Sequence, residues 1–133
     1  MQYLLDTNIC IYISKHKPAS VLAHFQTLSV GSVGMSVITY GELWCGIRKS
    51  TQFARSAKLL EALTALVPVL PFSANVAKFY GDVRAQLTAQ GQPIGNNDLW
   101  IAAHALSEKL ILVSNNLKEF SRVPGLHCEN WVE

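Results

Sequence analysis

Short apolar segments without alternating polar residues restrict the fold of this chain most. Four stand out, at residues 2–5, 35–38, 67–70 and 110–113. A strand with one face in water alternates apolar and polar residues, whereas a strand covered on both faces does not. Helical patterns separate these segments, and that order is typical of a parallel sheet with helices on both faces. We therefore expect an α/β fold with a central, mostly parallel sheet of four or five strands.

The helices are indicated by apolar residues at spacings of three and four. The longest pattern contains Val76, Phe79, Val83 and Leu87 and ends near Gly91. Other helices are expected after the first strand, from Pro18, and over residues 39–49, 52–66, 97–109 and 117–120, with an edge strand within residues 127–132. The length of 133 residues and the lack of a linker or repeat predict one domain, residues 1–133.

Composition excludes several classes of protein. Half of the residues are hydrophobic and only 15% are charged, which is opposite to the pattern of a disordered chain. No apolar run reaches the roughly 20 residues of a membrane-spanning helix, and no signal peptide is visible, so we expect a cytoplasmic protein. Cys10, Cys45 and Cys128 lack the spacing of a zinc site or a disulfide framework. The net charge of +2 does not by itself indicate a nucleic-acid partner.

Four of the nine acidic residues stand near the expected carboxyl ends of the strands, where open α/β sheets bind ligands. They are Asp6, Glu42, Asp98 and Glu119. Each also has an ordinary structural explanation. Asp6 suits a helix cap, Thr39 and Glu42 have the spacing of a capping box at the start of a helix, Asp98 suits a helix N-terminus, and Glu119 suits a solvent-facing position.

The acids considered together indicate a metal site. Carboxylates from separate segments that meet at one edge repel one another, and a cation relieves that repulsion. A set of oxygen ligands selects magnesium or manganese rather than zinc or copper. Nearby hydroxyls and amides are expected to orient a carboxylate or to bind a metal water; they are Thr7, Asn8, Ser114 and Asn116.

Several motifs carry a resemblance to a known family. They are LLDTN at residues 4–8, YGEL at 40–43, NDLWIAAHA at 97–105 and LVSNN at 112–116. Their order and spacing, over almost the whole chain, resemble a PIN-domain nuclease and, more narrowly, the VapC toxins of bacterial VapBC toxin–antitoxin pairs.

The resemblance implies a Mg²⁺-dependent endoribonuclease in which Mn²⁺ can substitute. In this interpretation Asp6 and Asp98 hold the metal with Glu42, which orients or deprotonates the attacking water. It also implies cleavage of tRNA, with the anticodon stem-loop of initiator tRNA as the expected target. The implied partners are a VapB-type antitoxin that inhibits the enzyme and a second copy in a homodimer, with a higher toxin–antitoxin assembly as an extension.

The sequence departs from the PIN pattern at the fourth acidic position, which is Asn116. Either its amide oxygen serves there or Glu119 reaches into the site. RNA contacts are expected from four basic residues around one helix–helix joint, for which a solvated polar rim is the alternative; they are Arg48, Lys49, Arg55 and Lys58. The alternative function is a PIN scaffold that binds RNA or a protein without cutting.

Overall fold

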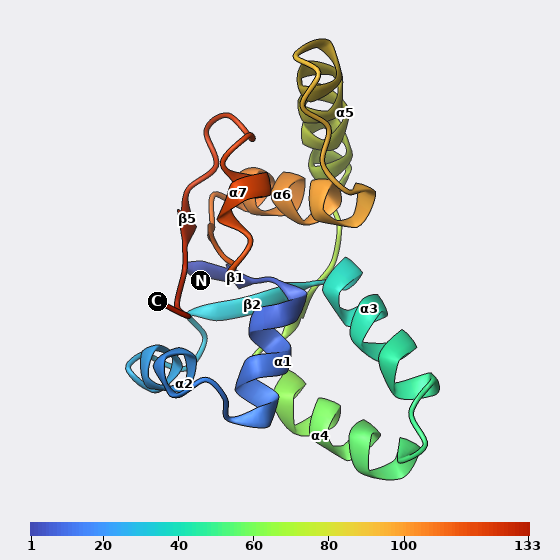
Figure 1. The fold of residues 1–133 in the computed structure, drawn as a ribbon, viewed down its shortest axis with the longest axis vertical. Coiled ribbons are helices and arrows are strands. Elements are labelled where there is room, and N and C mark those ends of the chain that lie inside the picture. Colours follow the sequence, from blue (N-terminus) through green and yellow to red (C-terminus); the bar gives the residue numbers. More distant parts are fainter.

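A sheet of five parallel strands forms the centre of the molecule (Figure 1). The computed structural model describes all residues, 1–133. The strands are β1 (Tyr3–Leu5), β2 (Val33–Ser36), β3 (Val69–Leu70), β4 (Ile111–Val113) and β5 (Cys128–Glu129). They are arranged in the order β3-β2-β1-β4-β5, and every neighbouring pair is parallel. The expected α/β class is therefore confirmed, with a sheet that is entirely parallel.

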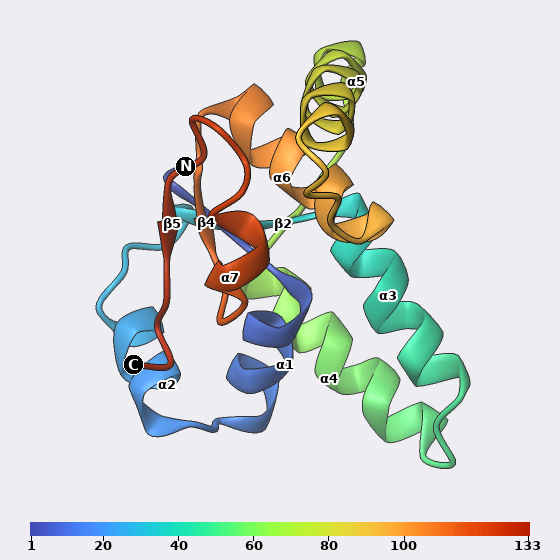
Figure 2. The ribbon, with the colours of Figure 1, turned by 45° about the horizontal axis from the view of Figure 1, so that its top comes forward.

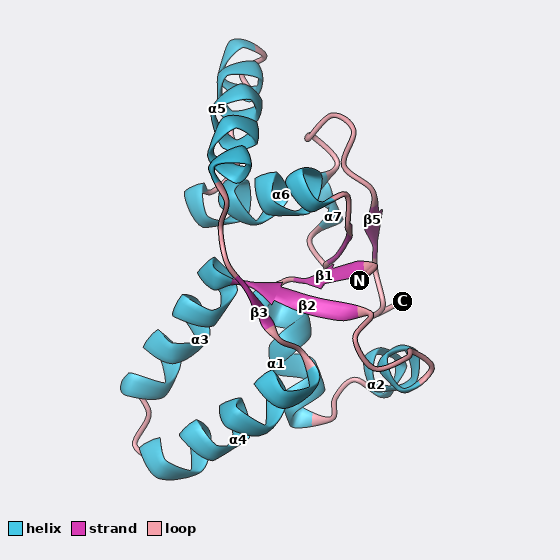
Figure 3. Ribbon diagram, turned by 180° about the vertical axis from the view of Figure 1, so that it is seen from behind, coloured by secondary structure: helices cyan, strands magenta, loops and turns pink.

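Seven helices connect and cover the strands. They are α1 (Thr7–Lys15), α2 (Ala19–Gln26), α3 (Val37–Arg48), α4 (Phe53–Leu66), α5 (Ala74–Ala89), α6 (Asn96–Glu108) and α7 (Leu117–Phe120). Helices α5, α6 and α7 lie on one side of the sheet, and α1, α2 and α4 lie on the other (Figures 1 and 3). Helix α3 begins at the sheet and runs away from it, and α4 returns to complete a helical hairpin (Figure 2). No helix combines the length and the apolar character needed to span a bilayer.

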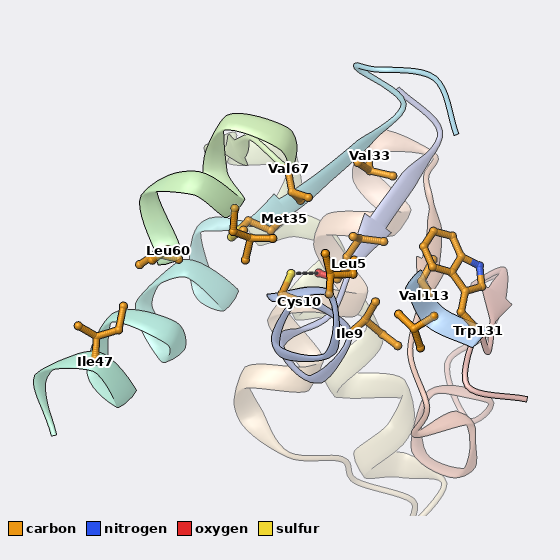
Figure 4. Packing of buried hydrophobic residues seen from close by; sticks show 13 residues of the cluster. Leu5, Ile9, Cys10, Val33, Met35, Ile47, Leu60, Val67, Val113 and Trp131 are labelled. Carbon is orange, nitrogen blue, oxygen red and sulfur yellow. Dashed lines mark hydrogen bonds between the residues drawn. The ribbon is translucent and has the colours of Figure 1, made fainter. Parts of the chain in front are cut away.

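Two hydrophobic cores, one on each face of the sheet, explain why the strands lack alternation. Leu5 belongs to the core beneath α1 and α4, together with Ile9 and Met35 (Figure 4). Leu4 belongs to the opposite core, which contains residues of α5, α6 and α7. Both leucines are completely buried, because successive residues of a strand point to opposite faces.

The second strand begins and ends earlier than the sequence pattern predicts. It was expected over residues 35–38 but runs from Val33 to Ser36, and residues 37 and 38 already belong to α3. Gly34 therefore lies inside the strand. A Cβ at Gly34 would meet the side chains of Met1 and Leu70 at 2.8 and 3.1 Å. The glycine permits this close packing and does not end the strand.

The remaining boundaries differ by one or two residues. The third strand is limited to Val69–Leu70, and β5 is a two-residue edge strand inside the expected segment. Pro18 precedes α2 as its N-cap residue instead of occupying the first turn. The three cysteines are free.

Candidate active site

The strand register brings three polar residues to one edge of the sheet. Leu5 is paired with Met35 on one side and with Val113 on the other. The next residue of each strand segment is Asp6, Ser36 or Ser114. All three are buried. The carboxyl ends of β1, β2 and β4 thus meet, as expected for this class of sheet.

Asp6 lies at the centre of this edge and is only 6% exposed. It is the N-cap residue of α1, and its Oδ1 accepts a hydrogen bond of 3.0 Å from the backbone N–H of Ile9. Burial raises the pKa of Asp6, and the hydroxyl of Ser114 and the N–H of Ile9 offset part of that rise. Asp6 is therefore both a helix cap and a buried carboxyl group whose charge is costly.

Glu42 lies in the second turn of α3 and is held by two side chains from other elements. The Thr7 hydroxyl donates to Glu42 Oε1 at 2.5 Å, and Asn97 Nδ2 donates to Oε2 at 3.4 Å. The expected capping box of Thr39 and Glu42 is wrong. The N-cap of α3 is Ser36, whose Oγ accepts from the N–H of Ile38 at 3.2 Å. The carboxylate of Glu42 is thus directed to the site and not to a helix end.

Asp98 and Glu119 form a pair of neighbouring carboxyl groups. Burial, a hydrogen bond to Glu119 and the nearby negative charges together raise the pKa of Asp98 to about 7. Partial burial opposes the charge of Glu119, but hydrogen bonds from Gly95 N–H and the Asn116 amide hold its pKa below the usual range. Asp98 therefore carries the proton of this pair at acidic pH, and Glu119 accepts a hydrogen bond from it.

The structure places Glu119, and not Asn116, next to Asp98. Asn116 Nδ2 donates to Glu119 Oε2 at 2.6 Å, and the Asn116 N–H donates to Ser114 Oγ at 2.9 Å. The Gly95 N–H donates to Glu119 Oε1 at 3.2 Å. Asn116 thus holds the carboxylate of Glu119 through a hydrogen bond and does not itself contact Asp98.

The donor set suits a hard divalent cation. The side chains at this edge offer oxygen atoms only, and Asp6, Glu42 and Glu119 each raise the pKa of Asp98 through hydrogen bonding or charge. A cation removes this repulsion and favours the ionised forms. No three His, Cys, Asp or Glu side chains are gathered closely enough to enclose an ion in this conformation. Asp6, Glu42 and Glu119 each accept hydrogen bonds from protein donors, whereas Asp98 is hydrogen-bonded to Glu119.

The other predicted site residues lie at the margin of this edge or beyond it. The Asn8 side chain is exposed, and only its backbone N–H supports Asp6. The basic residues Arg48, Lys49, Arg55 and Lys58 are exposed along the α3–α4 hairpin, which points away from the sheet (Figure 1). Arg48 lies over the ring of Phe53 at 5.2 Å. The structure does not bring these four residues together with the carboxylates.

The sequence patterns did not identify two amides of the site. Asn97 donates to Glu42, and Asn115 Nδ2 donates to the Tyr12 hydroxyl at 3.0 Å, which joins the end of β4 to α1. Both stand directly beside a residue that the patterns did single out. Their position within the NDL and SNN motifs is therefore the signal that could have found them.

Comparison with known proteins places this arrangement in context. The family model described as "PIN domain" matches residues 3–126. The chain is 44% identical to "Ribonuclease VapC2" of Haemophilus influenzae over 99% of both chains. It is 43% identical to "tRNA(fMet)-specific endonuclease VapC" of Shigella flexneri over 98% of both.

Solved structures agree in fold over the full length. The VapBC-1 structure from nontypeable Haemophilus influenzae superposes with a TM-score of 0.92 and 41% identity and covers 100% of both chains. The fold and the order of the elements are therefore shared with that toxin–antitoxin structure from end to end.

Proposed function

The chain belongs to the PIN-domain family and, within it, to the VapC ribonuclease toxins of VapBC toxin–antitoxin systems, and we propose that it cleaves tRNA with Mg²⁺ held by Asp6, Glu42 and Asp98. The observation that carries the metal proposal is the meeting of Asp6, Glu42, Asp98 and Glu119, from four separate segments, at the carboxyl edge of the sheet, where burial and the other three acids raise the pKa of Asp98. Such a cluster is costly without a cation.

The proposed substrate is initiator tRNA, cut in its anticodon stem-loop. The name of the Shigella flexneri relative, a tRNA(fMet)-specific endonuclease, supports this choice at 43% identity over nearly the whole chain. The basic residues of the α3–α4 hairpin are proposed to contact the RNA backbone at a distance from the scissile bond. No acidic residue interrupts positions 43–60, which contain Arg48, Lys49, Arg55 and Lys58.

The residues of the site have separate proposed roles. The chemistry that a bound Mg²⁺ supplies is charge neutralisation at the phosphodiester and a lower pKa for water; Mn²⁺ has the same oxygen preference. Asp6 and Asp98 are proposed to hold the metal together with Glu42. Glu42 is oriented by Thr7 and Asn97 and is proposed to accept the proton of the attacking water. Attack on phosphorus then leaves a 5′-phosphate and a 3′-hydroxyl.

Glu119 is proposed to complete the site, with Asn116 and Ser114 as its support. Glu119 is the side chain that reaches Asp98, whereas the Asn116 amide is engaged with Glu119 itself. Thr7 supports Glu42 in the same way. Asn8 contributes through its backbone N–H to Asp6.

A VapB-type antitoxin is the proposed protein partner. The solved VapBC-1 structure, named for both components, supports this at 41% identity. We further propose a homodimer, which a toxin–antitoxin assembly can extend, and inhibition of the ribonuclease by the antitoxin.

The decisive experiment is cleavage of purified initiator tRNA by antitoxin-free protein, with mapping of the new RNA ends. We expect cleavage with Mg²⁺ or Mn²⁺ and none with EDTA. The inactive control is Asp6→Asn and not Asp6→Ala, because Asp6 caps α1 and asparagine caps a helix equally well. Tight tRNA binding without any metal-dependent cut would support the non-catalytic scaffold instead, and an active Asp6→Asn protein would contradict the assigned site.

A further inference from the structure

Two arginines flank the segment that leads into α6, and neither has a carboxylate as its hydrogen-bond partner. The segment contains Pro93 and Gly95 and ends at Asn96, two residues before Asp98. Arg84 approaches it from α5 and Arg122 approaches it from beyond α7. Both side chains therefore lie against the segment that leads to Asp98.

Arg122 is anchored by a backbone oxygen. Its Nη1 donates to the carbonyl oxygen of Pro93 at 3.0 Å, and the side chain is half-buried. Its charge also reaches Glu119, because it contributes to the low pKa of that carboxyl. A guanidinium has five N–H donors in a planar fork. The bond to Pro93 fixes the orientation of this fork and leaves most of its donors free.

Arg84 is anchored by a phenol. Its Nη1 donates to the Tyr80 hydroxyl at 2.6 Å, and its Cζ lies 5.8 Å from the centre of that ring. The Tyr80 hydroxyl donates in turn to Asn96 Oδ1 at 2.6 Å. Tyr80 is also stacked on Trp100, with ring centres 3.7 Å apart and an interplanar angle of 11°. Tyr80 thus links an exposed arginine to the first residue of α6.

A cleft joins this arginine to the same segment. It has a volume of about 140 Å³, and Arg84, Pro93 and Asn96 are among its lining residues. The cleft opens beside the first turn of α6, which carries Asp98. The cleft and its arginine therefore lie next to the helical turn that carries Asp98.

The electrostatics of the site require such cations. A phosphodiester that approaches this edge meets Asp6, Glu42, Asp98 and Glu119, and its own charge is negative. Arginine binds phosphate through two parallel N–H donors, and a side chain already fixed by another bond loses little entropy in doing so. Arg48 ends α3 and Arg55 lies in the first turn of α4. The hairpin that these helices form runs away from the sheet (Figure 1), so these arginines do not supply this charge at the site itself.

We propose that Arg84 and Arg122 bind backbone phosphates of the RNA substrate on either side of the residue 93–96 segment and so position the scissile bond at the carboxylates. The inference rests on the proposed ribonuclease function and adds the two residues that hold the substrate next to the site. Tyr80 acts as a positioning residue for Arg84, and Pro93 does so for Arg122.

The test measures RNA affinity without cleavage, in the Asp6→Asn background. The probe is a fluorescent RNA hairpin with the sequence of the initiator tRNA anticodon stem-loop, titrated over a series of salt concentrations. Arg84→Gln and Arg122→Gln are each expected to weaken binding and to reduce the slope of log K against log salt by about 0.7 to 0.9, as for one lost phosphate contact. Arg122→Lys, which keeps the charge, is expected to retain most of the slope.

Lys78→Gln is the matched control, because Lys78 is an exposed cation on α5 as Arg84 is. It removes the same charge from the same helix and is expected to leave the slope unchanged. Thermal unfolding of each variant verifies the fold.

The outcomes separate the two proposals. Unchanged slopes for both arginine variants, or an equal loss with Lys78→Gln, would overturn the phosphate contacts while RNA binding by the parent still stands. The pH profile of cleavage is measured separately for Arg122→Gln in the protein that retains Asp6. An altered profile there, without a change in the salt slope, would mean that Arg122 acts only through Glu119, which also overturns its phosphate contact. Wild-type protein that neither binds nor cuts the hairpin or intact tRNA would contradict the proposed function itself.

Discussion

Glu42 shows how a single side chain in this site depends on neutral donors from distant positions. Thr7 and Asn97, 35 and 55 residues away in sequence, fix its two carboxylate oxygens. Hydrogen bonds of this kind orient a reactive carboxylate without adding a charge that would compete with a cation. The position of Glu42 is therefore sensitive to changes that leave the acid itself in place.

Thr7→Val is expected to lower tRNA cleavage by about 10- to 100-fold, because it removes the hydroxyl that orients Glu42 while keeping the shape of the side chain. The measurement is the initial rate at saturating Mg²⁺. Thr64→Val is the control, since the Thr64 hydroxyl bonds only the carbonyl of Glu61 on α4. Equal rates for the two variants would show that Glu42 does not need this hydrogen bond.

Asp98 links the site to the stability of the whole protein through pH. Its pKa is raised to about 7, against 3.8 for an unperturbed aspartate. Between these values the folded protein binds this proton more tightly than the unfolded chain does. The stabilisation from Asp98 is therefore complete below about pH 4 and is lost as the pH rises through 7.

Asp98→Asn is accordingly expected to raise the melting temperature of the metal-free protein more at pH 8 than at pH 5. The carboxyl is half-buried, so after allowance for solvent screening the difference is on the order of 1 kcal/mol, or a few degrees. Thermal unfolding in EDTA at several pH values measures it. Burial also lowers the pKa of His104, but this residue is present in both proteins and contributes equally to the pH dependence of their stability. A difference in melting temperature between the two proteins that does not change with pH would contradict the raised pKa of Asp98. Added Mg²⁺ is expected to reduce this difference at pH 8.

At the scale of elements, the start of α3 decides where Glu42 points. The sequence pattern suggested a start at Thr39, but Ser36 caps the helix and Thr39 is buried inside its first turn. Moving the start by two residues places Glu42 in the second turn, away from the helix end. The pattern failed here because both Ser36 and Thr39 satisfy the composition of a cap, and only the packing of β2 chooses between them.

Ser36→Ala is expected to lower the free energy of unfolding by about 1 kcal/mol, the usual effect of losing an N-cap. Ser73→Ala is a matched control, because Ser73 occupies the N-cap position of α5 but its side chain makes no capping hydrogen bond. Urea unfolding followed by circular dichroism gives both values. Similar losses in the two variants would mean that the Ser36 hydroxyl contributes no specific cap.

At the scale of the molecule, large hydrophobic side chains remain exposed on the α3–α4 hairpin. Trp44 is 41% exposed and Phe53 is 39% exposed, and their rings meet edge to face at 5.9 Å. Leu59 and Leu66 on α4 are more than 40% exposed as well. This surface contains part of the hydrophobic residues that lie outside the two cores.

We expect light scattering to give the mass of a dimer for the purified chain, with this surface in the contact. Trp44→Gln combined with Phe53→Gln is expected to shift the protein toward monomer, because aromatic side chains dominate such contacts. Val30→Gln is the control, since Val30 is 96% exposed outside the hairpin. A monomer at every concentration would contradict the proposed homodimer.

The sequence by itself determined the type and order of the elements, the class of the sheet and the family, and it predicted which acids stand at one edge of that sheet. These follow from local periodicity and from short motifs, which each segment carries independently of the others. The strand ends and the start of α3 were less well predicted, because Gly34 and Ser36 act through contacts with other elements.

Only the tertiary structure decided which polar atoms meet. The register of β1, β2 and β4 aligns Asp6 with Ser114. The packing of α6 and α7 brings Glu119 to Asp98, and the Asn116 amide bonds to Glu119. Asp6 and Ser114 are 108 positions apart in the sequence, and Asp98 and Glu119 are 21 positions apart. Their distances depend on how two hydrophobic faces pack onto one sheet, and no local pattern contains that information.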